Sequence, residues 1–129
     1  KKIMGICLGM QILASTGEES GPTEGLNLIP GNVKKIQNNS KDSLPHIGWN
    51  TVKICQDHPV LNGIKDNMDF YFVHSYRFCP IIESYTIGQS FYSEKFSWII
   101  AKENVIGFQF HPEKSQKYGL KIINNFCNW

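Results

Sequence analysis

The pattern of apolar and polar positions predicts an α/β fold with a helix near each end of the chain and strands between them. Residues 3–6 are apolar and lead into a glycine-flanked turn, after which residues 10–14 show the apolar spacing of a helix face. Residues 116–126 show a similar spacing and predict a closing helix. One stripe of that helix carries Leu120, Ile123 and Phe126.

The middle of the chain is predicted to consist of short strands joined by polar turns. Apolar alternation and β-branched or aromatic residues favour strands at 33–37, 51–55, 69–76, 85–92, 99–102 and 105–110. Small and polar residues predict a loop at 15–25, a polar loop at 38–43, irregular chain at 45–50, a helical turn at 58–64 and a hairpin turn at Asn104. No repeat or linker interrupts the pattern, and 129 residues suit one domain, residues 1–129.

The composition is that of an ordinary globular domain and gives no electrostatic reason to expect nucleic acid or a membrane as a partner. Apolar residues make up 41% of the chain, and 13 basic against 11 acidic residues give a net charge of +2. No apolar run has the length of a membrane span, and no signal peptide is recognisable. Four scattered cysteines, none at metal-ligand spacing, fit a reducing compartment. We expect a cytoplasmic protein without a metal site or cofactor.

The turn at residues 5–9 has the form of a nucleophile elbow in which cysteine replaces serine. Gly5 and Gly9 flank Cys7, and such small residues are expected to let backbone approach a strained strand-to-helix turn. The N–H groups of the following helix would favour the thiolate, and the N–H of Leu8 would face a developing oxyanion. The alternative is a small, unreactive core cysteine. The remaining cysteines lack this context and are interpreted as structural: Cys55, Cys79 and Cys127.

A thiol nucleophile needs a base and a group that orients the base, and His111 with Glu113 fits these roles. His111 ends an apolar strand, and Pro112 favours an extended backbone before it. Because side chains alternate along an extended chain, the imidazole and the carboxylate would point the same way. A structural histidine at a strand end is the alternative. The other histidines are weaker candidates: an exposed His58, a core His74 and an unassigned His46.

Two motifs, G-I-C-L-G-M-Q at 5–11 and G-F-Q-F-H-P-E at 107–113, together resemble the class I, or triad-type, glutamine amidotransferases. Within that family, shorter motifs resemble the glutaminase subunits of imidazole glycerol phosphate synthases. These motifs are N-L-I-P-G at 27–31, P-H-I-G-W-N at 45–50, Y-F-V-H-S-Y at 71–76 and H-P-E-K-S-Q at 111–116. The resemblance runs over the whole chain. It implies an open mixed, mostly parallel sheet flanked by helices, of flavodoxin-like type.

The resemblance also implies a reaction and a set of site residues. Cys7 would attack the side-chain amide of glutamine, His111 would carry the proton to the departing ammonia, and Glu113 would orient His111. Water would then release glutamate from a glutamyl thioester. The positions that match glutamine-binding residues are Gln11, Glu19, Ser75 and Tyr76. The alternatives are a solvated loop acid at Glu19 and a half-buried strand aromatic at Tyr76.

Glutaminases of this kind deliver ammonia to a (β/α)₈-barrel cyclase, with which they form a heterodimer that makes imidazole glycerol phosphate and AICAR for histidine biosynthesis. The positions that the resemblance places at that interface are Trp49, Asn50, Tyr71 and Lys114. An exposed tryptophan there would also fit the enrichment of aromatic residues at interface hot spots, and a core tryptophan is the alternative.

The resemblance further implies strands, helices and a glycine-rich oxyanion loop before the nucleophile strand, and the sequence given begins at Lys1. We therefore expect a partial domain within a natural protein of roughly 200 residues. Three alternatives stay open: a paralogous amidotransferase of surface-sugar biosynthesis, a cysteine peptidase or γ-glutamyl hydrolase on a similar elbow, and an inactive fragment that only binds the partner.

Overall fold

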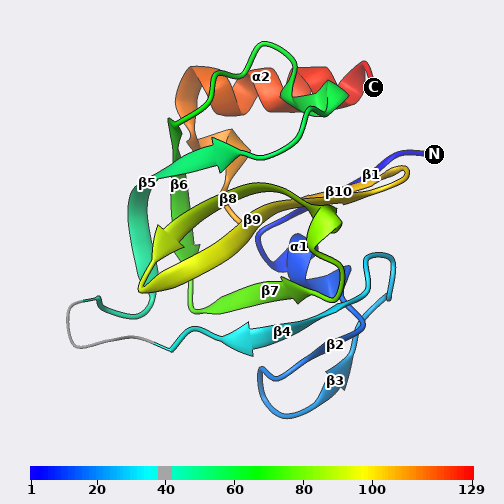
Figure 1. Ribbon diagram of the computed structural model, residues 1–129, viewed down its shortest axis with the longest axis vertical. Coiled ribbons are helices and arrows are strands. Elements are labelled where there is room, and N and C mark those ends of the chain that lie inside the picture. Colours follow the sequence, from blue (N-terminus) through cyan, green and yellow to red (C-terminus); the bar gives the residue numbers. More distant parts are fainter. Residues whose placement is uncertain (38–41) are drawn as a thin grey trace.

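The computed structural model describes residues 1–37 and 42–129, and within them six strands form one mixed sheet (Figure 1). The strand order is β1-β10-β9-β8-β5-β6. The strands are β1 (Ile3–Ile6), β5 (His46–Ile54), β6 (Met68–His74), β8 (Thr86–Tyr92), β9 (Glu94–Lys102) and β10 (Val105–Phe108). β1 pairs parallel with β10, and the other neighbours in this sheet pair antiparallel.

Four shorter strands form a second sheet in the order β3-β2-β4-β7. They are β2 (Thr16–Gly17), β3 (Thr23–Glu24), β4 (Gly31–Lys35) and β7 (Tyr76–Pro80). β2 and β4 are parallel, and the other two pairs are antiparallel. An ion pair of 3.1 Å between Arg77 on β7 and Glu94 on β9 links the two sheets.

The helices are few and lie where the sequence predicted them, near the two ends of the chain. α1 (Leu8–Ile12) follows β1 directly, and α2 (Gln116–Cys127) closes the chain. Within residues 1–37 and 42–129 there are also three single turns of 3₁₀ helix: η1 (Pro59–Leu61), η2 (Glu83–Tyr85) and η3 (Pro112–Lys114). In Figure 1, α1 lies between the large sheet and β7, while α2 lies at the top of the view, at the end of the molecule away from β2 and β3.

Among the described residues, the core consists of two clusters. The first gathers aromatic side chains of β6, β9 and β10 around Trp98 and adds Ile122 of α2. The second packs Met10 of α1 against Val33, Phe78 and Ile100, which come from both sheets. α1 is therefore clamped between the sheets, which fixes the end of the helix next to Cys7.

The sequence prediction of an α/β fold with a mixed sheet is confirmed, but its details need correction. Most described strand pairs are antiparallel, whereas the resemblance implied a mostly parallel sheet. Residues 45–50 were expected to be irregular, yet β5 starts at His46, because residues 46–52 pair with β6, from His46↔His74 to Val52↔Met68. The loop predicted at 15–25 contains β2 and β3. The strand predicted at 69–76 is interrupted at Ser75, after which the chain turns into the second sheet as β7.

Two further predictions concern the closing helix and the polar loop. The helix is confirmed, but Leu120 is 59% exposed, while Gly119 and Ile122 are the residues that α2 buries. The face of α2 that packs against the core is thus rotated about the helix axis from the predicted stripe. Most of the polar loop predicted at 38–43 lies outside the described residues.

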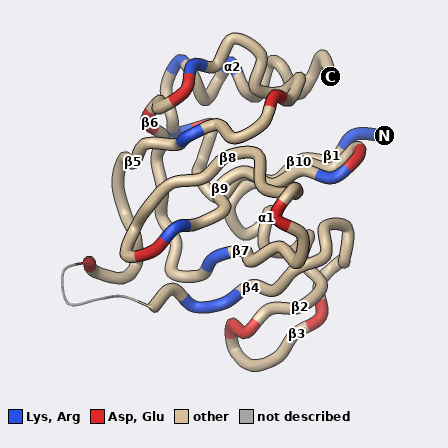
Figure 2. The backbone as a smooth tube through the Cα atoms, viewed as in Figure 1, with Lys and Arg blue, Asp and Glu red and all other residues tan. Residues whose placement is uncertain are grey.

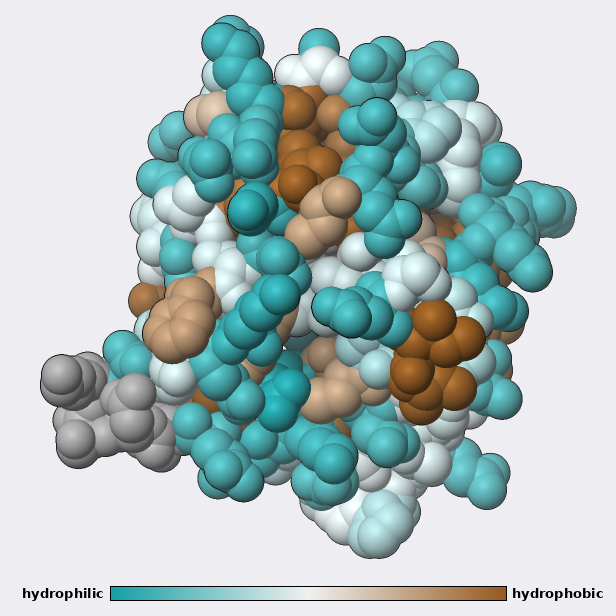
Figure 3. Space-filling model, viewed as in Figure 1, coloured by the Kyte–Doolittle hydropathy of each residue, from teal (hydrophilic) through white to brown (hydrophobic). Residues whose placement is uncertain are grey.

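Charge and apolar surface are both spread over the molecule. Figure 2 shows Lys and Arg along β4 and β7, and acidic residues near β2 and β3, so positive and negative groups are interspersed in this view. On the face shown in Figure 3, apolar side chains form separate patches surrounded by hydrophilic ones. No helix within residues 1–37 and 42–129 is long and apolar enough to cross a membrane.

Candidate active site

Cys7 occupies the turn between β1 and α1 in a backbone conformation that L-residues rarely adopt. Its φ is 53° and its ψ is −109°. The turn is held on both sides, because the N–H of Cys7 donates to the carbonyl of Phe108 at 2.7 Å and the N–H of Gln11 donates to the carbonyl of Cys7 at 3.2 Å. Strained conformations of this kind cost about 1–3 kcal/mol and are concentrated at functional sites. The predicted elbow at Cys7 is present.

The two glycines of the elbow have different environments. A Cβ on Gly5 would lie 2.5 Å from the backbone oxygen of Gly9, so Gly5 is required where β1 meets α1. A Cβ on Gly9 would meet nothing within 4 Å. The expectation of close backbone packing is therefore confirmed for Gly5 and wrong for Gly9, which lies in the first turn of α1 with open space beside it.

Burial raises the pKa of the Cys7 thiol above its ordinary value. The N–H of Leu8 lowers this pKa, the negative charge of Glu113 raises it, and hydrogen bonding to Gln109 and the charge of Lys114 lower it. From the sequence, the N–H groups of the helix were expected to favour the thiolate. Leu8 acts in that direction, but desolvation of the sulfur is the larger effect, so the free site holds a thiol.

His111 and Glu113 form the imidazole–carboxylate pair that the sequence predicted. Nδ1 of His111 lies 2.5 Å from Oε1 of Glu113. The backbone of His111 is extended, as expected, with φ −98° and ψ 97°. Glu113, however, lies in the 3₁₀ turn η3 rather than on an extended chain, because Pro112 begins that turn, and its side chain reaches back to the imidazole.

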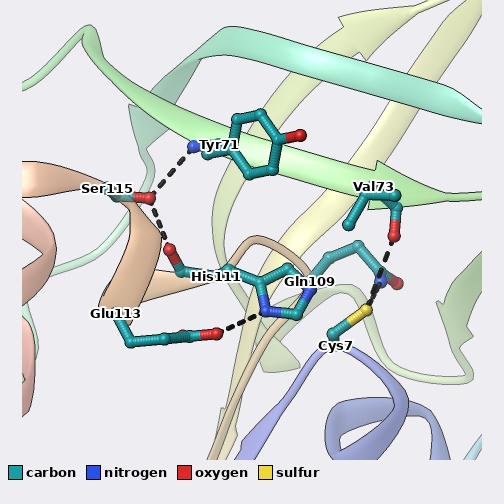
Figure 4. A network of polar contacts seen from close by, with 7 residues as sticks. All are labelled: Cys7, Tyr71, Val73, Gln109, His111, Glu113 and Ser115. Atoms are coloured by element: carbon teal, nitrogen blue, oxygen red, sulfur yellow. Dashed lines mark hydrogen bonds and ion pairs between the residues drawn. The ribbon is translucent and has the colours of Figure 1, made fainter.

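In Figure 4 the imidazole of His111 points from the end of β10 toward Cys7. Among the described residues, no hydrogen bond joins that imidazole to the sulfur; Sγ of Cys7 instead contacts the carbonyl of Val73 on β6 at 3.7 Å. A catalytic hydrogen bond is often long or absent in a free enzyme and tightens when substrate binds. The sulfur thus lies next to its candidate base but is paired with β6.

The backbone of Tyr71 on β6 fixes the position of His111. The N–H of His111 donates to the carbonyl of Tyr71 at 2.9 Å. The hydroxyl of Ser115, which is only 2% exposed, accepts from the N–H of Tyr71 at 3.0 Å and donates to the carbonyl of His111 at 2.6 Å (Figure 4). Ser115 therefore ties the beginning of α2, the His111 backbone and β6 together.

Gln109 and Gln11 extend the polar network at the sulfur. Nε2 of Gln109 lies 3.7 Å from Sγ of Cys7, and Oε1 of Gln109 accepts from Nε2 of Gln11 at 3.1 Å. Nε2 of Gln11 also donates to the carbonyl of Tyr76 at 3.2 Å. Gln11, which was predicted to bind glutamine, is therefore hydrogen-bonded to a side chain that contacts the sulfur of Cys7.

A pocket of about 220 Å³ opens beside Leu8 at the start of α1. Gln11 and Glu19 both line it, as expected for residues that hold a small polar substrate, and Glu19 is exposed in the loop after β2. Ser75 and Tyr76 are not among the lining residues, although Gln11 connects Tyr76 to the pocket. A larger pocket of about 680 Å³ lies between residues 54–64 and the end of α2, and it contains none of the predicted site residues.

Three of the residues predicted at a partner interface lie in the middle of the β5–β6 ribbon, and the fourth, Lys114, lies on η3. Trp49 is 49% exposed, so the alternative of a core tryptophan is wrong, and its ring meets that of the cross-strand residue Tyr71 edge to face at 5.9 Å. Asn50 donates from Nδ2 to the carbonyl of Phe91 at 3.3 Å, and Lys114 is exposed on η3. A role in binding a partner stays a prediction for all four residues.

The remaining histidines are accounted for by packing. His74 is a core histidine, as predicted, and its Nε2 lies 2.9 Å from Nδ1 of the buried His46. Burial lowers the pKa of each to about 4. His58 was predicted to be exposed but is half-buried against the ring of Trp129, and it accepts the N–H of Val60 at the start of η1.

Gln109 and Ser115 are the site residues that the sequence analysis missed. Gln109 could have been found, because it lies two residues before His111 and shares its side of an extended chain. Ser115 acts through a tertiary contact with β6 for which the sequence carries no signal. All four cysteines are free, and the described residues contain no group of three His, Cys, Asp or Glu side chains that could hold a metal ion.

The fold and the site define a class of α/β proteins in which an elbow cysteine faces a histidine–carboxylate pair. The family described as glutamine amidotransferase class-I matches residues 1–128. The chain belongs to this family.

Within this family, the chain is similar in sequence to particular known proteins. The imidazole glycerol phosphate synthase subunit HisH of Pelagibacter ubique is 48% identical over 129 residues, covering 99% of this chain and 62% of that protein. The subunit HisH of Methanocaldococcus jannaschii is 53% identical over 123 residues, covering 95% of this chain and 61% of that protein. The chain thus spans about three fifths of the length of these relatives.

A solved structure supports the fold. A glutamine amidotransferase from Thermotoga maritima superposes with a TM-score of 0.63 at 18% identity, covering 97% of this chain and 46% of that one.

Proposed function

We propose that this chain carries the nucleophile, base and orienting acid of a glutaminase that serves an imidazole glycerol phosphate synthase. The observation that supports this most directly is the His111–Glu113 pair, with a contact of 2.5 Å, at the end of the strand that pairs with the Cys7 strand. Identities of 48% and 53% to the HisH subunits support the choice of pathway.

In the proposed reaction, each of these groups has one role. Glutamine enters the pocket beside Leu8, where the carboxylate of Glu19 meets its α-ammonium group and Gln11 borders its side chain. His111 takes the proton of the Cys7 thiol as the sulfur attacks the amide carbon, and the N–H of Leu8 faces the developing oxyanion. His111 gives that proton to the departing ammonia, and water then hydrolyses the thioester to glutamate.

The raised pKa of Cys7 gives the base a defined task in this scheme. Because the buried sulfur is a thiol at neutral pH, attack requires a proton acceptor, and the carboxylate of Glu113 holds His111 in the tautomer that exposes a free Nε2. In the proposed complex, a (β/α)₈-barrel cyclase uses the ammonia. Trp49 and Lys114 are exposed beside the site and are the residues we propose for contact with that partner.

A coupled glutaminase assay tests the proposal. Glutamate release by the protein is measured alone and with a barrel cyclase subunit and its nucleotide ligand. We expect release to rise strongly with the liganded cyclase and to vanish in Cys7→Ala, while Cys127→Ala, which changes an exposed cysteine, keeps it. Release that persists in Cys7→Ala would refute the proposed nucleophile. Release that the cyclase leaves unchanged would favour the surface-sugar paralogue.

A further inference from the structure

We propose that Gln109 is a catalytic hydrogen-bond donor to the sulfur of Cys7, and that Gln11 holds the donor in place. This inference rests on the proposed function, because it assigns Gln109 a part in forming the nucleophile. Gln109 follows β10 directly, is 2% exposed, and has its backbone N–H bound to the carbonyl of Trp98 at 2.9 Å. Its side chain is therefore fixed at the base of the site, two residues before His111.

The orientation of the Gln109 amide follows from the carbonyl of Tyr76, which can only accept a hydrogen bond. The carbonyl of Tyr76 has no proton to give, so the atom of Gln11 that lies 3.2 Å from it is the nitrogen. That nitrogen also faces Gln109 at 3.1 Å, so the atom of Gln109 on that side is the oxygen. The NH₂ group of Gln109 is thereby turned toward the sulfur.

A donor directed at a buried sulfur stabilises the thiolate more than the thiol. A thiol is a weak acceptor, and the contact between Nε2 of Gln109 and Sγ of Cys7 is long, at 3.7 Å. Once the proton moves to His111, the sulfur carries a full charge, and a hydrogen bond to an ionised acceptor is shorter and stronger. Gln109 and the N–H of Leu8 then both donate to it, and both oppose the effect of burial.

The position of Gln11 connects this donor to the substrate pocket. The side chain of Gln11 lines the pocket and at the same time holds the oxygen of Gln109. A glutamine that contacts Gln11 therefore contacts the residue that fixes the direction of the donor. The chain of bonds runs from Tyr76 through Gln11 and Gln109 to Cys7.

The test is the pH dependence of alkylation at Cys7, which reports the thiolate and requires no glutamine. The full protein is treated with iodoacetamide between pH 6 and 10, and the modified Cys7 peptide is quantified by mass spectrometry, so that the other cysteines do not interfere. In Gln109→Met, which keeps the size of the side chain but removes the donor, we expect a slower rate at each pH below the midpoint. The fall should be about ten- to hundred-fold, since a hydrogen bond to a charged group is lost.

Two variants and a control sharpen the result. Gln109→Glu replaces the donor by a carboxylate and should shift the midpoint further upward than Gln109→Met. Gln11→Met frees the amide of Gln109 to rotate and should give a smaller upward shift. Gln89→Met, on β8 and outside the network, should leave the Cys7 profile unchanged.

An unchanged Cys7 profile in folded Gln109→Met would overturn the inference. If that variant does not fold, the side-chain ¹⁵N–¹H signals of Gln109 are followed by NMR in the wild-type protein. We expect their chemical shifts to change with pH at the midpoint of Cys7 alkylation. Chemical shifts that do not change at that pH would overturn the proposal. If the midpoint of Cys7 alkylation shifts upward in Gln109→Met but the wild-type protein releases no glutamate, the proposed function alone would be refuted.

Discussion

The sulfur of Cys7 lies between groups with opposite effects on its ionisation. Burial and the carboxylate of Glu113 raise its pKa, whereas the N–H of Leu8 and the amide of Gln109 lower it. Because burial is the largest contribution, the thiol form dominates in the free protein at neutral pH. In the proposed mechanism, thiolate formation therefore depends on transfer of this proton to His111.

The carboxylate of Glu113 is predicted to be essential for the base and dispensable for the fold. Its side chain is 44% exposed, and its contact is with Nδ1 of His111. Glu113→Gln keeps the shape but removes the charge that selects the imidazole tautomer. We expect glutaminase kcat to fall by up to about 10⁴-fold, the loss seen when the orienting aspartate of a serine-protease triad becomes an amide. Steady-state kinetics with glutamine measures it.

The matched control for this prediction is Glu103→Gln. Glu103 is exposed in the turn between β9 and β10, at the far end of the strand that leads to His111. Its kcat should equal that of the wild type. Equal kinetics for Glu113→Gln and Glu103→Gln would contradict the role of the carboxylate.

Ser115 is predicted to affect both stability and activity, because its hydroxyl serves two backbone groups at once. Ser115→Ala leaves the N–H of Tyr71 and the carbonyl of His111 without this partner. We expect the free energy of unfolding to fall by about 1–3 kcal/mol and kcat to fall as His111 loosens. Urea denaturation and a glutaminase assay measure the two effects, and the exposed Ser84→Ala serves as the control. A wild-type unfolding midpoint for Ser115→Ala would rule out the bridge.

At the scale of elements, the β1–Cys7–α1 elbow gives opposite predictions for two glycines in one motif. Gly5→Ala places a methyl group 2.5 Å from the oxygen of Gly9, and we expect it to destabilise the protein by about 1–3 kcal/mol, the usual cost of overpacking. Gly9→Ala meets open space in a helix and should be neutral or stabilise by up to about 1 kcal/mol. Thermal denaturation of the two variants compares them, and equal losses of stability would show that the elbow packs differently.

The β5–β6 pair predicts a loss of stability in acid. His46 and His74 face each other across this pair, and burial lowers the pKa of each from 6.5 to about 4. Because the unfolded chain takes up these protons at higher pH than the folded one, stability is full above pH 6.5 and falls as the pH drops toward 4. Each proton contributes a slope of up to about 1.4 kcal/mol per pH unit.

Urea denaturation at several pH values between 7.5 and 4.5 checks this prediction. His46→Phe, which keeps a ring against Tyr92 but removes one titrating group, should show a shallower fall of the unfolding free energy over that range. A slope equal to that of the wild type would mean that His46 does not titrate in this way.

Elements of the fold that depend on neighbouring residues could be predicted from the sequence, and elements that depend on contacts between distant residues could not. The elbow at Cys7 and the strand leading to His111 have local signals: an apolar run, glycines at fixed spacing and a proline after the histidine. β5 follows Pro45 and carries Gly48 and polar residues near its start, and this part is a strand only because β6 pairs with it. Local propensity cannot anticipate such a partner.

In the site, too, pairs of residues close in the sequence could be predicted and contacts between distant residues could not. His111 and Glu113 are two residues apart, so their pairing could be predicted, although the chain bends at Pro112 to make it. Gln109 approaches the sulfur, and Ser115 approaches β6, only through contacts between residues 102 and 44 positions apart in the chain. The parts of the site found from sequence are thus its local motifs, and the parts missed are the hydrogen bonds that join them.

For the whole molecule, the central claim is that one cysteine out of four is a nucleophile and that it directly precedes Leu8, which lines the proposed glutamine pocket. Labelling with 6-diazo-5-oxo-L-norleucine, a glutamine analogue that alkylates an attacking sulfur, tests it most directly. After peptide mapping by mass spectrometry, we predict an adduct at Cys7, protection of Cys7 by excess glutamine, and slower labelling in His111→Gln. Labelling spread over the exposed Cys55 and Cys127 with none at Cys7, or an adduct at Cys7 that glutamine does not suppress, would contradict the account.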